Sequence, residues 1–127
     1  MNEYRLASDS WDNKEIDAIQ TVIESGRFTM GSKVKTFEQE FAEHHSAKFG
    51  VMTNSGSSAN LIMLAAILYN NNFPNSGNII VPAVSWSTTY FPVTQMGFKL
   101  KFVDIDLATF NLDYSQVEDA IDDKTIG

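Results

Sequence analysis

Apolar residues recur at helical spacing near the start of the chain. The first series consists of Ile16, Ile19 and Ile23. Steps of three and four residues place these side chains on one face of a helix, which we expect over residues 13–25. Asp12 and Glu15 have the spacing of a capping box, with aspartate in place of serine or threonine, and Gly26 offers a stop. The pattern therefore predicts an amphipathic helix with both of its ends marked.

A second amphipathic pattern follows the loop GRFTMGS. Its apolar face carries Val34, Phe37 and Phe41. The other face carries Lys35, Glu38, Glu40 and Glu43. This division predicts a second helix whose charged face meets solvent.

Beyond this point, short apolar runs alternate with helical segments. The strand candidates are FGVMTN (49–54), NIIVPAV (78–84) and KLKFVDID (99–106). We expect a buried helix at 57–69 and another at 87–96, which Pro92 should kink or shorten, and a short one after the cap-like pair Asp113 and Gln116. Such alternation is typical of the α/β class, with a mostly parallel sheet and helices on both faces.

Composition narrows the class of protein. The chain has 127 residues, of which 43% are hydrophobic, enough for a core. A net charge of −7 gives no reason to expect nucleic acid or an anionic membrane surface as a partner. The absence of cysteine excludes disulfides and thiolate metal sites within these residues. No signal sequence or membrane-spanning run is apparent, so we expect a cytoplasmic location.

The alternation of strands and helices predicts a longer protein than these 127 residues. Three strand candidates make a thin sheet, and the chain stops after a helix, where alternation would supply another strand. We therefore expect residues 1–127 to be one incomplete N-terminal part of a larger domain.

The segment NSGSSANL is the first candidate for chemistry. It follows a strand candidate and opens a helix, whose first N–H groups have no partner within the helix. Those amides, the helix dipole and the hydroxyls of Ser57 and Ser58 suit a phosphate, and Gly56 permits close approach. An ordinary serine cap is the simpler interpretation of this segment alone.

The segment VPAVSWSTTYFP is the second candidate. Trp86 follows a strand, at the sheet edge where open α/β folds bind ligands, and its indole could stack on a planar group. A core tryptophan is the simpler interpretation of Trp86 alone. Together, a phosphate-binding helix start and an aromatic plate favour pyridoxal or pyridoxamine phosphate.

Four segments in this order resemble one known family. They are SGRFTMGSKVKTFEQEFA, NSGSSANL, VPAVSWSTTYFP and KFVDID. The chain resembles the DegT/DnrJ/EryC1/StrS family of sugar aminotransferases and dehydrases from about Leu6 to Thr125. Its motif sequences are most similar to those of the 4-keto-6-deoxysugar 3-dehydrase branch of this family. The resemblance implies the fold type I architecture of aspartate aminotransferase, with residues 1–127 in the large cofactor-binding domain, and a homodimer.

The resemblance also implies roles for individual residues. Gly56 and Ser57 match positions that hold the cofactor phosphate, Ser58 assists, and Trp86 matches the residue that stacks on the pyridine ring. A weaker match places the loop Phe28, Thr29, Met30 and Gly31 on the substrate side of the pocket.

The resemblance places no catalytic residue within this chain. The family's acidic partner of the pyridine nitrogen and its catalytic lysine or histidine lie beyond residue 127. Asp104 and Asp106 are better interpreted as turn and cap residues, and the adjacent His44 and His45 as surface residues, not metal ligands.

Three functions stay open at this stage. The first is a pyridoxamine-phosphate-dependent dehydrase that removes the C3 hydroxyl of a nucleotide-linked 4-keto-6-deoxyhexose in deoxysugar and O-antigen precursor synthesis. The second is a keto-sugar aminotransferase of the same fold. The third, of another class, is a non-catalytic phosphate-binding or structural module.

Overall fold

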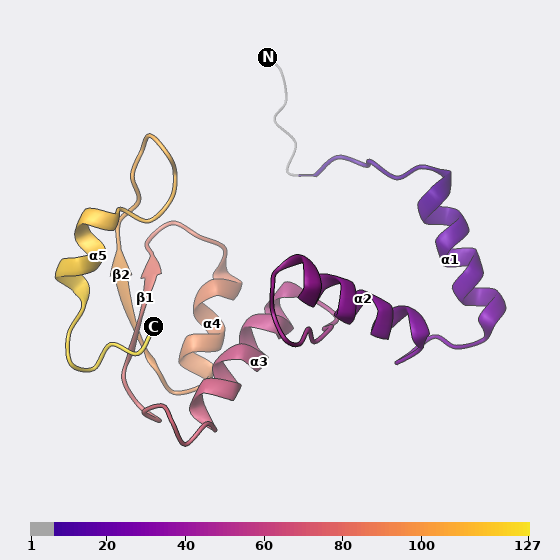
Figure 1. Ribbon diagram of the computed structural model, residues 1–127. Coiled ribbons are helices and arrows are strands. Elements are labelled where there is room, and N and C mark those ends of the chain that lie inside the picture. The colour runs from indigo at the N-terminus through magenta and orange to yellow at the C-terminus, as the bar shows by residue number, and fades with distance from the viewer. Residues whose placement is uncertain (1–6) are drawn as a thin grey trace, which may run out of the picture. The chain divides into compact units, whose positions relative to one another are not determined.

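The computed structural model describes residues 7–127 of the chain (Figure 1). Residues 1–6 of the domain expected at 1–127 lie outside the described residues. The chain divides into two units, the first ending at Met52 and the second spanning Thr53–Gly127. None of the helices within 7–127 has the length and apolar character needed to cross a membrane.

The first unit opens with the predicted capping box. Helix α1 spans Asn13–Ser25. The Lys14 N–H donates to Asp12 Oδ1 at 2.6 Å, and the Asp12 N–H donates to Glu15 Oε2 at 2.8 Å. Gly26 then adopts a left-handed φ of 65°, which an L side chain disfavours. Both predicted ends of this helix are confirmed.

Helix α2 spans Ser32–His44 and carries the predicted aromatic face, where the rings of Phe37 and Phe41 lie 5.4 Å apart. The strand predicted at 49–54 does not form within residues 7–127, where no segment pairs with it. The Met52 N–H donates to the Glu38 carboxylate at 2.9 Å, so a side chain takes the place of a neighbouring strand.

The second unit is organised around β1, which spans Asn78–Pro82. Strand β2, Lys99–Val103, runs parallel to it, with Asn78 opposite Lys99. On the other edge of β1, residues 124–127 pair in parallel. The Asn78 N–H donates to the Lys124 carbonyl at 2.8 Å, and the Ile80 N–H donates to the Gly127 carbonyl at 2.8 Å. Hydrogen bonds therefore hold β1 on both edges.

Helices lie on both sides of this strand pair, as predicted. In Figure 1, α3 (Gly56–Leu68) and α4 (Ser87–Gln95) lie on one side, and α5 (Tyr114–Ala120) lies on the other. The predicted cap of α5 is present, because the Gln116 amide donates to the Asp113 carboxylate at 2.7 Å.

The core of the second unit lies between α3, α4 and the strands. Its buried side chains are Leu64, Val93 and Phe98. The helix expected to be buried at 57–69 is only partly so, since Leu64 is its one buried residue and Met63 is 56% exposed. A helix that is apolar on every side is stable when other elements pack against all of its faces. In this unit, α4 packs against one face of α3.

A polar network joins β1, β2 and the segment before residues 124–127. The buried Asn78 amide donates to Asp122 Oδ1 at 2.9 Å, and Thr125 Oγ1 donates to Asn78 Oδ1 at 2.9 Å. Lys101 Nζ lies 2.8 Å from Asp122 Oδ2. The hydrogen bonds from Lys101 and then Asn78 hold the pKa of Asp122 well below its usual value.

The lowered pKa of Asp122 predicts a pH dependence of stability. Because the pKa is lower in the folded than in the unfolded chain, the carboxylate stabilises the fold above about pH 4. This contribution is lost as the pH falls below that value. We expect Asp122→Asn to lower the urea midpoint at pH 7 more than at pH 3. The neighbouring Asp123→Asn should change it little at either pH, and an equal loss for Asp122→Asn at both would contradict the account.

Candidate functional site

The carboxyl ends of the two parallel strands meet at one edge of the second unit. The Ala83 N–H donates to the Val103 carbonyl at 2.7 Å, so the two strand ends are joined directly. The chain leaves β1 through residues 83–86 into α4, and it leaves β2 through the loop 104–113. Open α/β sheets bind ligands at such an edge.

The start of α3 presents backbone donors to this side of the unit. Ser55 is the N-cap, and its Oγ accepts from the Ser58 N–H at 3.2 Å. Thr53 Oγ1 donates to the Ser55 carbonyl at 2.9 Å and steadies the cap. Within the described residues, the N–H groups of Gly56 and Ser57 have no acceptor, as expected for the first positions of a helix.

Gly56 is not required by the packing of the chain itself. A Cβ built on this residue would meet no atom within 4 Å apart from its chain neighbours and the backbone of its own helix turn. Its backbone does not adopt the left-handed conformation that favours glycine, because its φ is not positive. Open space beside an unpaired backbone donor is what a phosphate oxygen would need for close approach.

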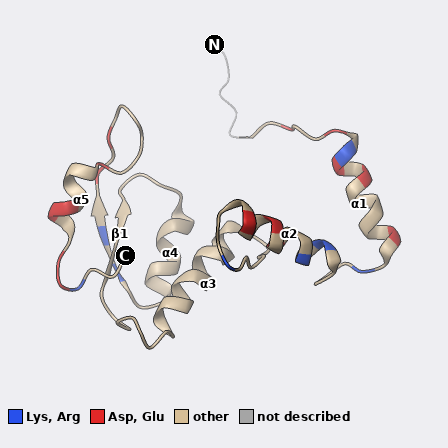
Figure 2. Cartoon of the chain, in the orientation of Figure 1, with Lys and Arg blue, Asp and Glu red and all other residues tan. Residues whose placement is uncertain are grey.

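A hollow lies between α3 and α4. Its volume is about 190 Å³. Ser57, Ser58 and Leu61 line it from one helix, and Thr88, Phe91, Pro92 and Gln95 line it from the other. Neither helix contains an acidic or basic residue (Figure 2). An anion at this place would therefore be held by amides, hydroxyls and helix dipoles, not by a lysine or arginine.

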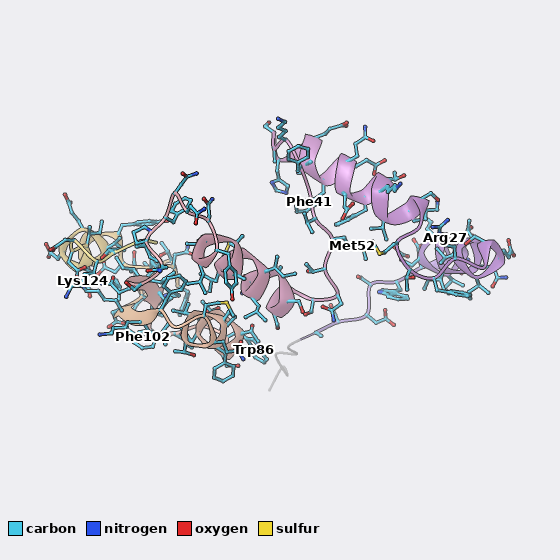
Figure 3. The ribbon with its side chains drawn as sticks, turned by 90° about the horizontal axis from the view of Figure 1, so that it is seen from below. Arg27, Phe41, Met52, Trp86, Phe102 and Lys124 are labelled. Atoms are coloured by element: carbon cyan, nitrogen blue, oxygen red, sulfur yellow. The ribbon has the colours of Figure 1, made fainter. Side chains whose placement is uncertain are left out.

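Trp86, labelled in Figure 3, is the N-cap residue of α4. Its side chain is 71% exposed. The interpretation of Trp86 as a core residue is therefore wrong for this chain. The indole lies outside the lining of the hollow, two residues before Thr88. Its exposed ring leaves a face that a planar group can cover.

The loop Phe28–Gly31 belongs to the first unit. Phe28 is 70% exposed, and Met30 is 82% exposed with a left-handed φ of 47°. This conformation costs a non-glycine residue about 1–2 kcal/mol, and such strain often marks a functional loop. Phe28 and Gly31 line a hollow of about 380 Å³ between the end of α1 and the start of α2.

The acidic residues after β2 accept hydrogen bonds from backbone N–H groups of the following loop, as predicted for turn and cap residues. The Asp104 carboxylate accepts from the Ile105 N–H at 2.8 Å, and Asp106 Oδ1 accepts from the Ala108 N–H at 2.7 Å. His44 and His45 are exposed at the end of α2. Among residues 7–127, no group of three histidine, cysteine or acidic side chains is placed to hold a metal ion.

Comparison with known proteins supplies the identity of the fold. A model of the DegT/DnrJ/EryC1/StrS aminotransferase family matches residues 9–127. The chain therefore belongs to this family, and the resemblance seen in the sequence is confirmed.

Two relatives are especially similar to the chain. GDP-4-keto-6-deoxy-D-mannose 3-dehydratase from Yersinia pseudotuberculosis is 50% identical over 98% of the chain. The structure of the Escherichia coli enzyme of that name with bound hydrated PLP is 48% identical, with a TM-score of 0.87 over 98% of the chain. The chain spans about a third of their length, at 32% and 33%. The predicted fold type I architecture is confirmed.

An aminotransferase is more distant. UDP-4-amino-4-deoxy-L-arabinose–oxoglutarate aminotransferase from Shewanella sediminis is 26% identical over 90% of the chain, which covers 28% of that protein.

The exposure of Trp86 predicts a small effect on stability. We expect Trp86→Ala to change the free energy of unfolding of the cofactor-free protein by less than about 1 kcal/mol, as for other surface residues. Phe98→Ala is the matched control, because Phe98 is 3% exposed and its loss should cost about 3–5 kcal/mol. Denaturant unfolding measures both. If Trp86→Ala lowered the free energy of unfolding as much as Phe98→Ala, Trp86 would have to be a buried core residue.

Proposed function

We propose that residues 1–127 form the N-terminal part of the large cofactor-binding domain of a 3-dehydratase. The enzyme uses pyridoxal or pyridoxamine 5'-phosphate and removes the C3 hydroxyl of a nucleotide-linked 4-keto-6-deoxyhexose, in deoxysugar and O-antigen precursor synthesis. One observation carries this proposal. The identity with the Yersinia 3-dehydratase is nearly twice that with the aminotransferase.

The start of α3 fits the phosphate of this cofactor. Gly56 and Ser57 offer backbone N–H groups without acceptors in the described chain, beside open space at the Gly56 Cα. The hydroxyls of Ser57 and Ser58 add donors at the same helix end. The positive end of the α3 dipole favours the phosphate charge.

Trp86 fits the ring of the cofactor. Its exposed indole would stack on the pyridine plane, which fixes the orientation of the ring but moves no proton. When bound, pyridoxamine phosphate supplies the amine that takes up the C4 ketone and the electron sink that permits loss of the C3 hydroxyl. This chain contributes binding and orientation. The groups that transfer protons belong to the remainder of the protein.

The loop at residues 28–31 lies on the substrate side in this proposed function. Phe28, Thr29, Met30 and Gly31 form the loop that meets the sugar nucleotide, and the strained backbone at Met30 supports a constrained role for this loop. The intact protein works as a homodimer in the cytoplasm, in keeping with the family resemblance.

Gly56→Ala separates binding from folding. Alanine favours a helix by up to about 1 kcal/mol over glycine, and its methyl group meets no atom within 4 Å beyond its own helix turn and chain neighbours. We therefore expect unchanged or slightly higher stability in denaturant unfolding. The same methyl group would crowd the phosphate, so the dissociation constant for pyridoxamine phosphate should rise about tenfold or more. Unchanged affinity would contradict the proposed phosphate site.

The residue at the cofactor position distinguishes the dehydratase from the aminotransferase. A lysine there would link covalently to pyridoxal phosphate and return the amine to the enzyme, whereas a histidine can act only as a base. We predict histidine. The test is to mix the intact protein with pyridoxal phosphate, add borohydride and search for attached cofactor by mass spectrometry. A phosphopyridoxyl-lysine at the active-site position would favour the aminotransferase.

A further inference from the structure

A proline inside α4 leaves one carbonyl without its usual partner. Pro92 has no backbone N–H, so it cannot donate to the carbonyl four residues earlier, which is that of Thr88. The missing donor comes from another helix, because Asn60 Nδ2 of α3 donates to the Thr88 carbonyl at 3.2 Å. This hydrogen bond is partly buried. A side chain on α3 therefore completes the backbone bonding of α4.

The bond joins two places that matter for the proposed function. Asn60 lies four residues after Gly56, one turn into α3, and Thr88 lies two residues after Trp86. The link therefore spans the first turns of the helix that binds phosphate and the helix that carries the stacking indole. A shift of one helix start relative to the other would have to break this bond.

A second contact fixes the same turn of α4 to the sheet. The Tyr90 hydroxyl donates to the Pro82 carbonyl at the end of β1, at 2.8 Å. The Tyr90 ring packs edge to face on Phe102 of β2, with ring centroids 5.3 Å apart. Tyr90 holds α4 to the strands, and the bond from Asn60 joins the packing of Leu64 against Val93 in linking α4 to α3.

We propose that Asn60 is a positioning residue that sets the distance between the phosphate-binding start of α3 and Trp86. This inference rests on the proposed function, in which both helix starts hold one cofactor. A merely structural role would be to satisfy the Thr88 carbonyl left open by Pro92. The two roles separate in a variant in which that carbonyl is satisfied within α4.

The experiment uses the full-length protein that contains this chain, with Asn60→Leu alone and combined with Pro92→Ala. Asn60→Leu should lower the urea midpoint and raise the dissociation constant for pyridoxamine phosphate about five- to tenfold, the scale of one hydrogen bond. Pro92→Ala restores an N–H that can bond to Thr88 within the helix. The double variant should therefore regain most of the midpoint while its dissociation constant stays raised.

Two controls show whether the effect is specific. Pro92→Ala alone is the reference for the double variant, because Asn60 still links the helices in it, and the double variant should bind pyridoxamine phosphate several-fold more weakly than this reference. Gln39→Leu removes a helix amide whose hydrogen bond, to Glu43 at 2.9 Å, stays within one helix. It should leave cofactor affinity unchanged.

A second measurement needs no cofactor. In protein labelled with 5-fluorotryptophan, the ¹⁹F resonance of Trp86 is assigned by its loss in Trp86→Phe. Asn60→Leu and the double variant should shift or broaden this resonance, whereas Gln39→Leu should not. An unmoved resonance, or an affinity that recovers together with the midpoint in the double variant, would overturn the positioning role. A wild-type protein that binds no pyridoxamine phosphate would overturn the proposed function, and the ¹⁹F result would still decide whether Asn60 positions Trp86.

Discussion

The order of the second unit depends on β1 being hydrogen-bonded along both edges. β2 occupies one edge, and residues 124–127 occupy the other through backbone bonds of 2.8–3.0 Å. A parallel sheet brings the carboxyl ends of its strands to one edge, so this pairing determines where the residues after β1 and β2 emerge. The network around Asn78 and Asp122 satisfies the polar groups where these segments meet. The placement of Trp86 beyond β1 follows from that register.

The candidate site itself depends on how two helix starts are held. Neither α3 nor α4 carries a charged residue, so affinity for an anion must come from unpaired amides, hydroxyls and the helix dipole. Those interactions are short-ranged and require accurate placement. Pro92 cannot donate a backbone hydrogen bond within α4. Asn60 of α3 donates instead to the Thr88 carbonyl, and this bond links the two helices. A local departure from ideal helix geometry thus ties the two sides of the site together.

Local signals predicted much of the fold, because they act within a few residues. The capping box at Asp12 fixed the start of α1, helical periodicity located α2, and apolar runs and cap residues located the remaining helices and two strands. The strand expected at 49–54 does not form within residues 7–127, because no segment there pairs with it, and the Met52 N–H bonds to the Glu38 carboxylate. The exposure of Trp86 also depends on tertiary contacts. The link from Asn60 was missed, although a lone amide in an apolar helix and a proline four residues after Thr88 were visible signals.

In the proposed function, the backbone of Gly56 and Ser57 holds the phosphate of the cofactor. The most direct measurement is an NMR titration of the intact protein, labelled with ¹⁵N on glycine and serine, with pyridoxamine phosphate. Gly56→Ala and Ser57→Ala assign the two resonances. The account predicts that these two amides shift downfield far more than other labelled amides, with one shared dissociation constant, because charged acceptors form strong hydrogen bonds. Saturating cofactor that shifts other amides and leaves these two unmoved would contradict it.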